Sequence, residues 1–286
     1  MQINPNVRDC APAPIAQAWT WVSDRPTNAA PVIDACQAVP TEPPPAFHSE
    51  AVASAIVDGS AMNYTPIAGL DPLRAALAAD LSERYGASIA ATDAIITAGC
   101  NQAFCTAIDA VAGAGDNVVL PVPYYFNHDM WLGIRGIEPR HLTPDDAMIP
   151  SPDAAQRLID DRTRAILLVT PNNPTGAVYP AATIRAFYEL ATSRGIALIL
   201  DETYRDYAPL NAAPHHLFSE PDWRDTVMHL YSFSKAYSLT GYRVGALVCG
   251  GDTHAAAIKI QDCAQICAPH IGQLAALHAL ENLQPW

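Results

Sequence analysis

From residue 94 onward the chain alternates short apolar, β-branched runs with stretches of helical character. Runs of this kind are typical of strands buried on both faces of a mostly parallel sheet, with helices covering each face. In such sheets, ligands bind beyond the carboxyl ends of the strands. The pattern therefore predicts an α/β domain and directs attention to the residues after each run. The six runs are AIIT (94–97), NVVLP (117–121), AILLVT (165–170), ALILDE (197–202), VMHLYS (227–232) and VGALVC (244–249).

The part of the chain before the predicted sheet has two different patterns. The first fifty residues are irregular and rich in proline, most densely in VPTEPPPAF (39–47), which favours an arm laid over a surface. In PLRAALAADLSERYG (72–86), leucines recur at Leu73, Leu77 and Leu81, and Gly86 is suited to end a helix. We therefore expect an arm followed by a helix.

Composition excludes several classes of partner. The net charge of −13, with no run of Lys and Arg, argues against a protein that binds nucleic acid through its phosphates. No apolar stretch reaches the roughly 18–20 residues that a membrane span needs, so we expect a cytoplasmic protein with no membrane partner. The seven cysteines are odd in number and lack paired metal spacing, so neither a disulfide framework nor a metal site is expected.

Two predicted strands end in turns that suit a ligand. After residues 94–97, a glycine-containing turn enters a helix at Cys100 and Asn101, and free N–H groups at a helix start suit a phosphate. Such turns also serve as plain connections. After residues 165–170, PNNPTG (171–176) brings Asn173 to the strand end, either as an amide for a ligand oxygen or as an ordinary turn residue.

Two further strand ends carry charged side chains. Asp201 follows the apolar residues ALIL, and Tyr204 lies three residues beyond it. A carboxylate buried there requires a cationic partner, and a structural salt bridge to an arginine is the alternative interpretation. The next strand leads to Ser234 and Lys235 and, eight residues further on, to Arg243.

The lysine in this group is unusual for the chain. Lys235 and Lys259 are the only lysines, against fourteen arginines. Chance and genomic base composition are two explanations. The chemical explanation is that an amine, unlike a guanidinium, can lose its proton and attack a carbonyl.

One ligand requires this whole set of groups. Pyridoxal 5′-phosphate (PLP) carries an aldehyde, a pyridine nitrogen, a phenolic oxygen and a phosphate. The motifs also resemble those of the class I/II aminotransferases, which are fold type I PLP-dependent enzymes. The resemblance runs in the family's order through NYTPIAGLDPLRAALA (63–78), AGCNQAF (98–104), PYYFNH (123–128), PNNPTG (171–176), DETY (201–204) and SFSKAYSLTGYRVG (232–245).

The resemblance implies a role for each of the catalytic candidates. Lys235 would form the Schiff base with the cofactor and then act as general base and acid. Asp201 would pair with the pyridine N–H and so keep the ring able to accept electrons. Tyr204 and Asn173 would donate hydrogen bonds to the phenolic oxygen.

The resemblance also implies the remaining cofactor contacts. Ser232, Ser234 and Arg243 would hold the phosphate, together with backbone N–H groups near Cys100 and Asn101.

The resemblance also assigns roles to three residues that are neither catalytic candidates nor phosphate contacts within one subunit. Tyr125 would stack on the pyridine ring, with ordinary core packing as the alternative. Tyr64 would reach the phosphate of a neighbouring subunit, which implies a homodimer with shared active sites. Ala38 takes the place of a glycine that lies near the substrate.

The fold implied by the resemblance is a three-layer α/β/α large domain with a mostly parallel sheet and an N-terminal arm. We expect residues 1–48 to form the arm and part of a small domain, and residues 49–286 to form the PLP-binding domain. We expect the C-terminal small domain to be absent, since no residue matches the arginine that binds the substrate α-carboxylate.

The function implied is transfer of an amino group between an amino acid and a 2-oxo acid. Two alternatives remain open. One is another PLP reaction on the same fold, by a lyase, decarboxylase or cyclase, because the fold does not select which bond breaks. The other is a catalytically impaired PLP-binding module.

Overall fold

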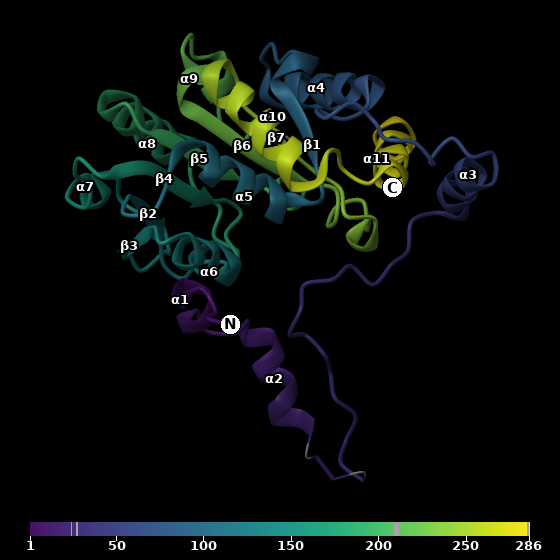
Figure 1. Cartoon of the computed structure of the whole chain (residues 1–286), viewed down its shortest axis with the longest axis horizontal. Coiled ribbons are helices and arrows are strands. Elements are labelled where there is room, and N and C mark those ends of the chain that lie inside the picture. Colours follow the sequence, from purple (N-terminus) through teal and green to yellow (C-terminus); the bar gives the residue numbers. More distant parts are fainter. Residues whose placement is uncertain (24, 27, 209–211, 285) are drawn as a thin grey trace.

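The strands of the protein form one twisted sheet, flanked by helices (Figure 1). The computed structural model describes residues 1–23, 25–26, 28–208, 212–284 and 286. Within these residues the sheet has seven strands in the order β1-β7-β6-β5-β4-β2-β3. They are β1 (Ala94–Thr97), β2 (Asn117–Pro121), β3 (Glu138–Leu142), β4 (Thr163–Val169), β5 (Ala197–Asp201), β6 (Val227–Ser232) and β7 (Gly245–Val248).

The sheet is mostly parallel. Strand β7 pairs antiparallel with both of its neighbours, β1 and β6, and the other pairs are parallel. Because two reversals restore the direction, β1 runs the same way as β6. The carboxyl ends of β1, β4, β5 and β6 therefore lie at the same edge of the sheet.

Helices connect the strands and cover both faces of the sheet. Those of the N-terminal region are α1 (Pro5–Asp9), α2 (Pro14–Ser23), α3 (Ala46–Val57) and α4 (Asp71–Tyr85). The helices within and after the sheet region are α5 (Cys100–Val111), α6 (Phe126–Arg135), α7 (Pro152–Gln156), α8 (Ala181–Arg194), α9 (Trp223–Thr226), α10 (Gly251–Gln265) and α11 (His270–Asn282).

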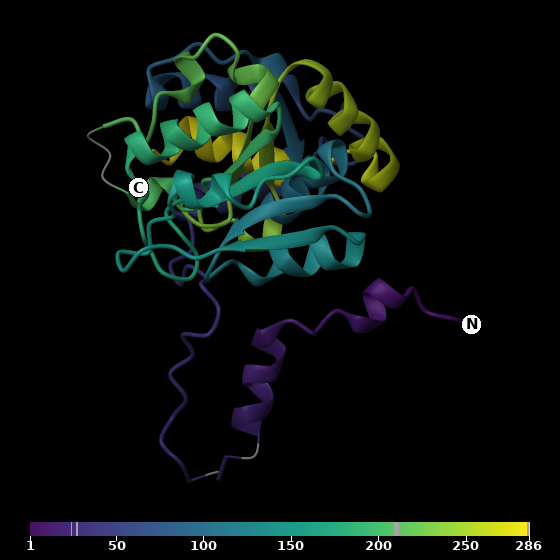
Figure 2. The ribbon, with the colours of Figure 1, turned by 90° about the vertical axis from the view of Figure 1, so that its left-hand side faces the viewer.

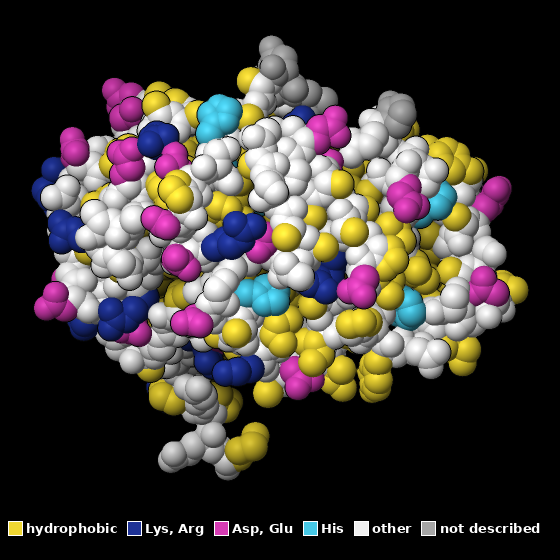
Figure 3. Space-filling view, turned by 90° about the horizontal axis from the view of Figure 1, so that it is seen from above, with side chains coloured by type: hydrophobic (Ala, Val, Ile, Leu, Met, Phe, Trp, Pro, Cys, Tyr) yellow, Lys and Arg dark blue, Asp and Glu magenta, His cyan; other side chains and the backbone are white. Residues whose placement is uncertain are grey.

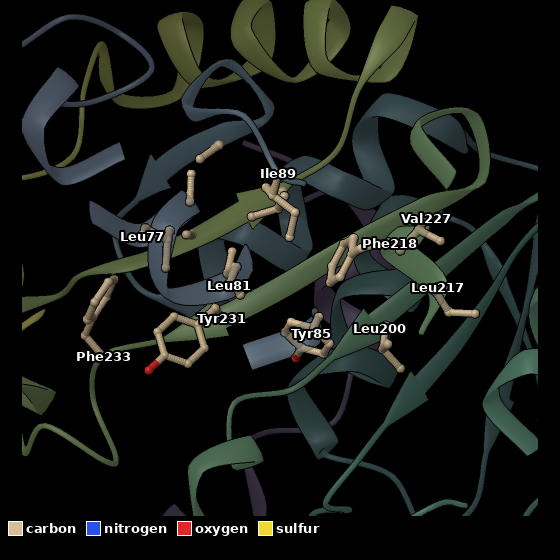
Figure 4. Packing of buried hydrophobic residues seen from close by; sticks show 14 of the residues in the cluster. Leu77, Leu81, Tyr85, Ile89, Leu200, Leu217, Phe218, Val227, Tyr231 and Phe233 are labelled. Carbon is tan, nitrogen blue, oxygen red and sulfur yellow. The ribbon is translucent and has the colours of Figure 1, made fainter. Parts of the chain in front are cut away.

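Two separate hydrophobic cores show that the domain has three layers. The larger core joins one face of the sheet to α4, α8 and α11. The smaller core joins the opposite face to α5, α6 and α10. Figure 4 shows part of the larger core, where Leu77, Leu81 and Tyr85 of α4 lie over the sheet beside Tyr231 and Phe218. Adjacent strand residues alternate between the cores, as burial of both faces requires.

The structure confirms the main sequence predictions for this region. All six predicted strands are present, with ends that differ by no more than two residues. The predicted helix is α4, with Leu73, Leu77 and Leu81 fully buried. Gly86 ends it in the left-handed conformation at φ 61°.

The sequence did not reveal β3. This strand reads EPRHL and lies at the sheet edge, paired only with β2, and within it only Leu142 is buried. Charged residues and a proline are tolerated on an edge strand because one side of it has no partner strand. The missing apolar run is therefore a consequence of its edge position.

Much of the N-terminal region extends away from the domain (Figures 1 and 2). Helix α1 lies against α6, and α2 projects outward before the chain returns toward the domain (Figures 1 and 2). The described residues 28–45 contain no helix or strand. This extended return segment carries Ala38 to the sheet edge where β6 ends, because the carbonyl of Ala38 accepts a hydrogen bond from Lys235.

The charged side chains on one face of the molecule are of mixed sign. On the face shown in Figure 3, Lys and Arg side chains lie among Asp and Glu side chains and form no continuous basic patch. Within the described residues, no helix combines the length and apolar character needed to cross a membrane.

The packing of α4 generates a stability prediction. Leu81→Ala should lower the free energy of unfolding by about 2–5 kcal/mol, because it leaves a cavity in the larger core. Val178→Ala, at a side chain that is 51% exposed, should change it by less than about 0.5 kcal/mol. Urea unfolding of both variants measures the difference. Equal effects would contradict the proposed packing of α4 on the sheet.

Candidate active site

Four strand ends gather the candidate residues at one edge of the sheet. Thr97 of β1 pairs with Gly245, which also pairs with Ser232 of β6, so the ends of β1 and β6 are level. Asp201 at the end of β5 pairs with Val169 of β4 on one side. The loops that follow these strands are therefore neighbours, although Thr97 and Ser232 are 135 residues apart in the sequence.

Asp201 is buried, with 5% of it exposed. Its carboxylate accepts a hydrogen bond from the N–H of Thr203 at 3.0 Å and lies 3.3 Å from Nε2 of His128. Burial alone would raise the pKa of Asp201, but the hydrogen bond and charge of His128 outweigh it and the net effect lowers the pKa. The carboxylate thus stays ionised in a buried place.

The structure pairs Asp201 with a histidine, and the arginine alternative is not what the described residues show. His128 lies in the first turn of α6, in the PYYFNH motif, and is itself buried. Sequence reasoning missed it, because a single histidine 73 residues before Asp201 forms no local pattern with it. The signal was its position three residues after Tyr125, on the helix that follows a strand of the same sheet.

Cys100 is a second neighbour of Asp201. Its Sγ lies 3.7 Å from Oδ1 of Asp201. Burial, followed by the charge of Asp201, raises the pKa of the Cys100 thiol, so the sulfur keeps its proton and acts as a donor. The start of α5 is therefore in contact with the end of β5.

Glu202, the next residue, has a different environment. It is buried on the other side of the strand, where Tyr85 donates a hydrogen bond to Oε2 and Nε2 of His229 lies 2.9 Å from the same oxygen. Nε2 of His215 lies 3.4 Å from it. Burial would raise the pKa of Glu202, but the two histidines lower it overall. His215, for which the sequence indicates no role, belongs to this structural network.

Lys235 follows β6 and faces the same edge as Asp201. Its Nζ is 5.7 Å from the centre of the Tyr204 ring and donates a hydrogen bond to the carbonyl of Ala38 in the arm. Burial, followed by the positive charge of Arg243, lowers the pKa of Lys235. A lowered pKa increases the fraction of uncharged amine, which is the nucleophilic form.

Tyr204 and Asn173 lie on the loops after β5 and β4. Burial, followed by the charge of Asp201, raises the pKa of Tyr204 to about 12, so its hydroxyl remains a donor. Asn172 forms the turn, accepting hydrogen bonds from the N–H and hydroxyl of Thr175 at 3.1 and 2.8 Å. The half-buried Asn173 has no side-chain hydrogen bond to another described residue, which leaves its amide free to bind a ligand.

Arg243 lies against the start of α5. Its guanidinium donates a hydrogen bond to the carbonyl of Thr240 at 2.9 Å and approaches the carbonyl of Ala98 at 3.5 Å. Gly99 has a φ of 82°, which favours glycine, and a methyl group on it would lie 2.4 Å from Nη2 of Arg243. The guanidinium and the N–H groups of a 12-residue helix thus converge on one place, which suits an anion.

The hydroxyl groups after β6 complete this anion site. Ser232 and Ser234 are both buried, and the N–H of Ser234 donates to Oγ of Ser232 at 3.2 Å. A methyl group on Gly245 would lie 2.7 Å from the backbone N of Cys100. The close approach of β7 to α5 therefore keeps the serines and the helix start together.

Two tyrosines differ in their relation to the site. Tyr125, at the start of α6, is half-buried with its ring 5.2 Å from that of His128, and its hydroxyl accepts a hydrogen bond from Asn127 at 2.8 Å. Asn101 also faces this hydroxyl. Tyr64, by contrast, is 78% exposed, and the structure does not bring it together with the other candidates.

Comparison with known proteins identifies the family. A profile described as aminotransferase class I and II matches residues 30–284. The chain belongs to the class I and II aminotransferase family. The match covers the arm from residue 30, the sheet and α11, and so includes nearly all of the candidate site.

Individual relatives agree with this assignment. The chain is 30% identical over 249 residues to the aspartate/prephenate aminotransferase of Thermus thermophilus, covering 83% of this chain and 61% of the relative. It is 31% identical over 251 residues to the aromatic aminotransferase ISS1 of Arabidopsis thaliana, covering 85% and 62%. The chain thus spans about three fifths of the length of these curated relatives.

A solved structure confirms the predicted fold. Aspartate aminotransferase from Thermus thermophilus with maleate superposes with a TM-score of 0.89 at 25% sequence identity, covering 99% of this chain and 74% of that one. The protein therefore has the fold type I architecture, with a mostly parallel sheet between two helical layers.

The family depends on PLP, and the residues at the sheet edge fit that cofactor. The anion site built from Arg243, the two serines and the start of α5 suits a phosphate. The ionised Asp201 suits a protonated pyridine nitrogen, and the half-buried amine of Lys235 suits an aldehyde. The three groups come from neighbouring strand ends, as one ligand of this size requires.

The environment of Lys235 generates a pH prediction. Acylation of the two lysines in the cofactor-free protein should show a pH midpoint for Lys235 below the ordinary lysine pKa of about 10.4. Arg243→Gln should raise that midpoint, because it removes a nearby positive charge. Peptide mass spectrometry measures labelling of Lys235, with the exposed Lys259 as the reference for reagent access. A midpoint at or above 10.4 for wild type would be inconsistent with the described environment.

Proposed function

We propose that this protein is a PLP-dependent aminotransferase that moves an amino group between an amino acid and a 2-oxo acid. The observation that carries the proposal is the convergence of Lys235, Asp201 and the Arg243 anion site at one sheet edge. The names of the relatives, which include aspartate, prephenate and aromatic aminotransferases, support this reaction class.

PLP, when bound, supplies an aldehyde for the amine and a pyridine ring that withdraws electrons from the substrate Cα. Lys235 provides the attacking amine, and its lowered pKa favours the uncharged form. The same Nζ, as an uncharged amine, would act as general base and acid for a proton at the substrate Cα.

The residues around Lys235 hold charge and protons in place. Asp201, kept ionised by His128, holds a proton on the pyridine nitrogen. Tyr204 and Asn173 donate hydrogen bonds to the phenolic oxygen. Tyr125, beside His128, would stack on the pyridine ring, and Arg243 with Ser232 and Ser234 would hold the phosphate.

We also propose an organisation for the chain. Residues 1–48 form an N-terminal arm with part of a small domain, and residues 49–286 form the PLP-binding domain. The molecule acts as a cytoplasmic homodimer in which Tyr64 reaches the phosphate site of the neighbouring subunit. The exposure of Tyr64, Met62, Ile56 and Val57 supports a partner surface there.

A catalytically impaired PLP-binding module is the second candidate. The observation that favours it is that no described residue is matched to an arginine for the substrate α-carboxylate. Binding of the cofactor without turnover is the result that this candidate predicts.

Spectra and trapping test the proposed function. Wild type and Lys259→Ala should become yellow with PLP and, after borohydride, carry a covalent adduct on Lys235, whereas Lys235→Ala should not. Amino acids that are substrates should remove the colour, and a 2-oxo acid should restore it. An adduct with no response to any amino acid would favour the impaired module, and no adduct in folded wild type would contradict both candidates.

A further inference from the structure

The loop that carries Tyr64 is firmly held, although Tyr64 itself is exposed. Tyr64 and Met62 are 78% and 83% exposed, and no hydrogen bond or ring contact joins Tyr64 to another described residue. The next residue, Thr65, is buried. The side chain of Tyr64 therefore projects outward from a loop whose following residues are fixed in the domain.

Gln273 of α11 is the main anchor of this loop. Its side chain is fully buried and makes three hydrogen bonds. Oε1 accepts from the N–H of Leu70 at 2.8 Å, and Nε2 donates to Oγ1 of Thr65 and the carbonyl of Ala268, both at 2.9 Å. One side chain thus joins both ends of residues 65–70 to the turn that precedes α11.

Two further contacts hold the same loop. Nδ1 of His270 lies 2.9 Å from the carbonyl of Asn63 and donates to it. Gln261 of α10 donates to the carbonyls of Ile67 and Ile96, at 3.3 and 2.6 Å. The backbone on both sides of Tyr64 is therefore fixed by side chains of α10 and α11.

The start of α11 also contacts the loop that carries Arg243. A methyl group on Gly272 would lie 2.4 Å from the carbonyl oxygen of Tyr242, so α11 and the residue before Arg243 are in close contact. The same helix turn thus supports an outward-facing tyrosine and the inward-facing anion site of its own chain.

We propose that Gln273 is a positioning residue that aims Tyr64 at the cofactor phosphate of a second copy of this chain. The inference rests on the proposed function, in which Tyr64 serves the neighbouring site. A buried amide costs free energy unless it is fully hydrogen-bonded, and a leucine would fill the space without that requirement. The three hydrogen bonds of Gln273 instead fix the backbone from which Tyr64 projects.

Hybrid dimers, prepared with two affinity tags, separate this role from a general effect on folding. Lys235→Ala in one chain leaves a single site that can be trapped with borohydride, in the other chain. By the proposal, that site receives Tyr64 from the Lys235→Ala chain. Gln273→Leu is placed either in the Lys235→Ala chain or in the chain that keeps Lys235. The fraction of Lys235 trapped by borohydride is then measured as a function of PLP concentration.

The proposal predicts an asymmetric result. Gln273→Leu in the chain that supplies Tyr64 should weaken PLP binding about tenfold, and the same change in the chain that keeps Lys235 should alter it less than about twofold. Tyr64→Phe should give the same asymmetry. Thr65→Val, which removes one partner of Gln273 and keeps the buried amide, serves if Gln273→Leu does not fold.

The control variant is Gln284→Leu, two residues beyond the C-terminal end of α11. Gln284 donates to Asp80 and Tyr237, both at 3.1 Å, and contacts neither the Tyr64 loop nor the anion site. It should change PLP binding in neither hybrid. Three results would each overturn the proposal. They are equal weakening of PLP binding in both hybrids, weakening only when Gln273→Leu is in the chain that keeps Lys235, and a wild-type chain that stays monomeric when loaded with PLP. No trapping in the wild-type dimer would instead mean that the proposed function has failed.

Discussion

The site depends on keeping the carboxylate of Asp201 ionised inside the protein. Moving a carboxylate out of water is costly, and the contacts with His128 and the N–H of Thr203 offset that cost. His128 belongs to α6, and Cys100, the thiol beside Asp201, begins α5. The same two helices form the smaller core, so the packing of that face determines where the charge of Asp201 lies.

Asp201, at the end of β5, and the adjacent Glu202 have different environments, because successive side chains of an extended strand point to opposite faces of the sheet. Asp201 faces the ligand edge, whereas Glu202 points to the other side, where Oε2 lies within hydrogen-bond distance of Tyr85 and His229 and 3.4 Å from His215. Both carboxyl groups have lowered pKa values despite burial. Only Asp201 shares its edge with Lys235 and Arg243, so position alone gives the two residues different roles.

The sequence allows the fold and most of the site to be predicted, because strand ends and family motifs are local signals. Buried apolar runs mark β1, β2, β4, β5, β6 and β7, but β3 is a polar edge strand and leaves no such run. The pairing of His128 with Asp201, and the contact of Ala38 with Lys235, join segments 73 and 197 residues apart. Such contacts are set by how the layers pack, which no local pattern encodes.

The protonation state of the pyridine nitrogen tests the central claim, that an ionised, buried Asp201 organises this edge for PLP. The measurement is nitrogen NMR of the protein loaded with PLP labelled at its ring nitrogen, for wild type and Asp201→Asn at neutral pH. The account predicts a protonated nitrogen in wild type and an unprotonated one in the variant, which folds and still traps the cofactor. The same protonation state in both proteins would contradict it.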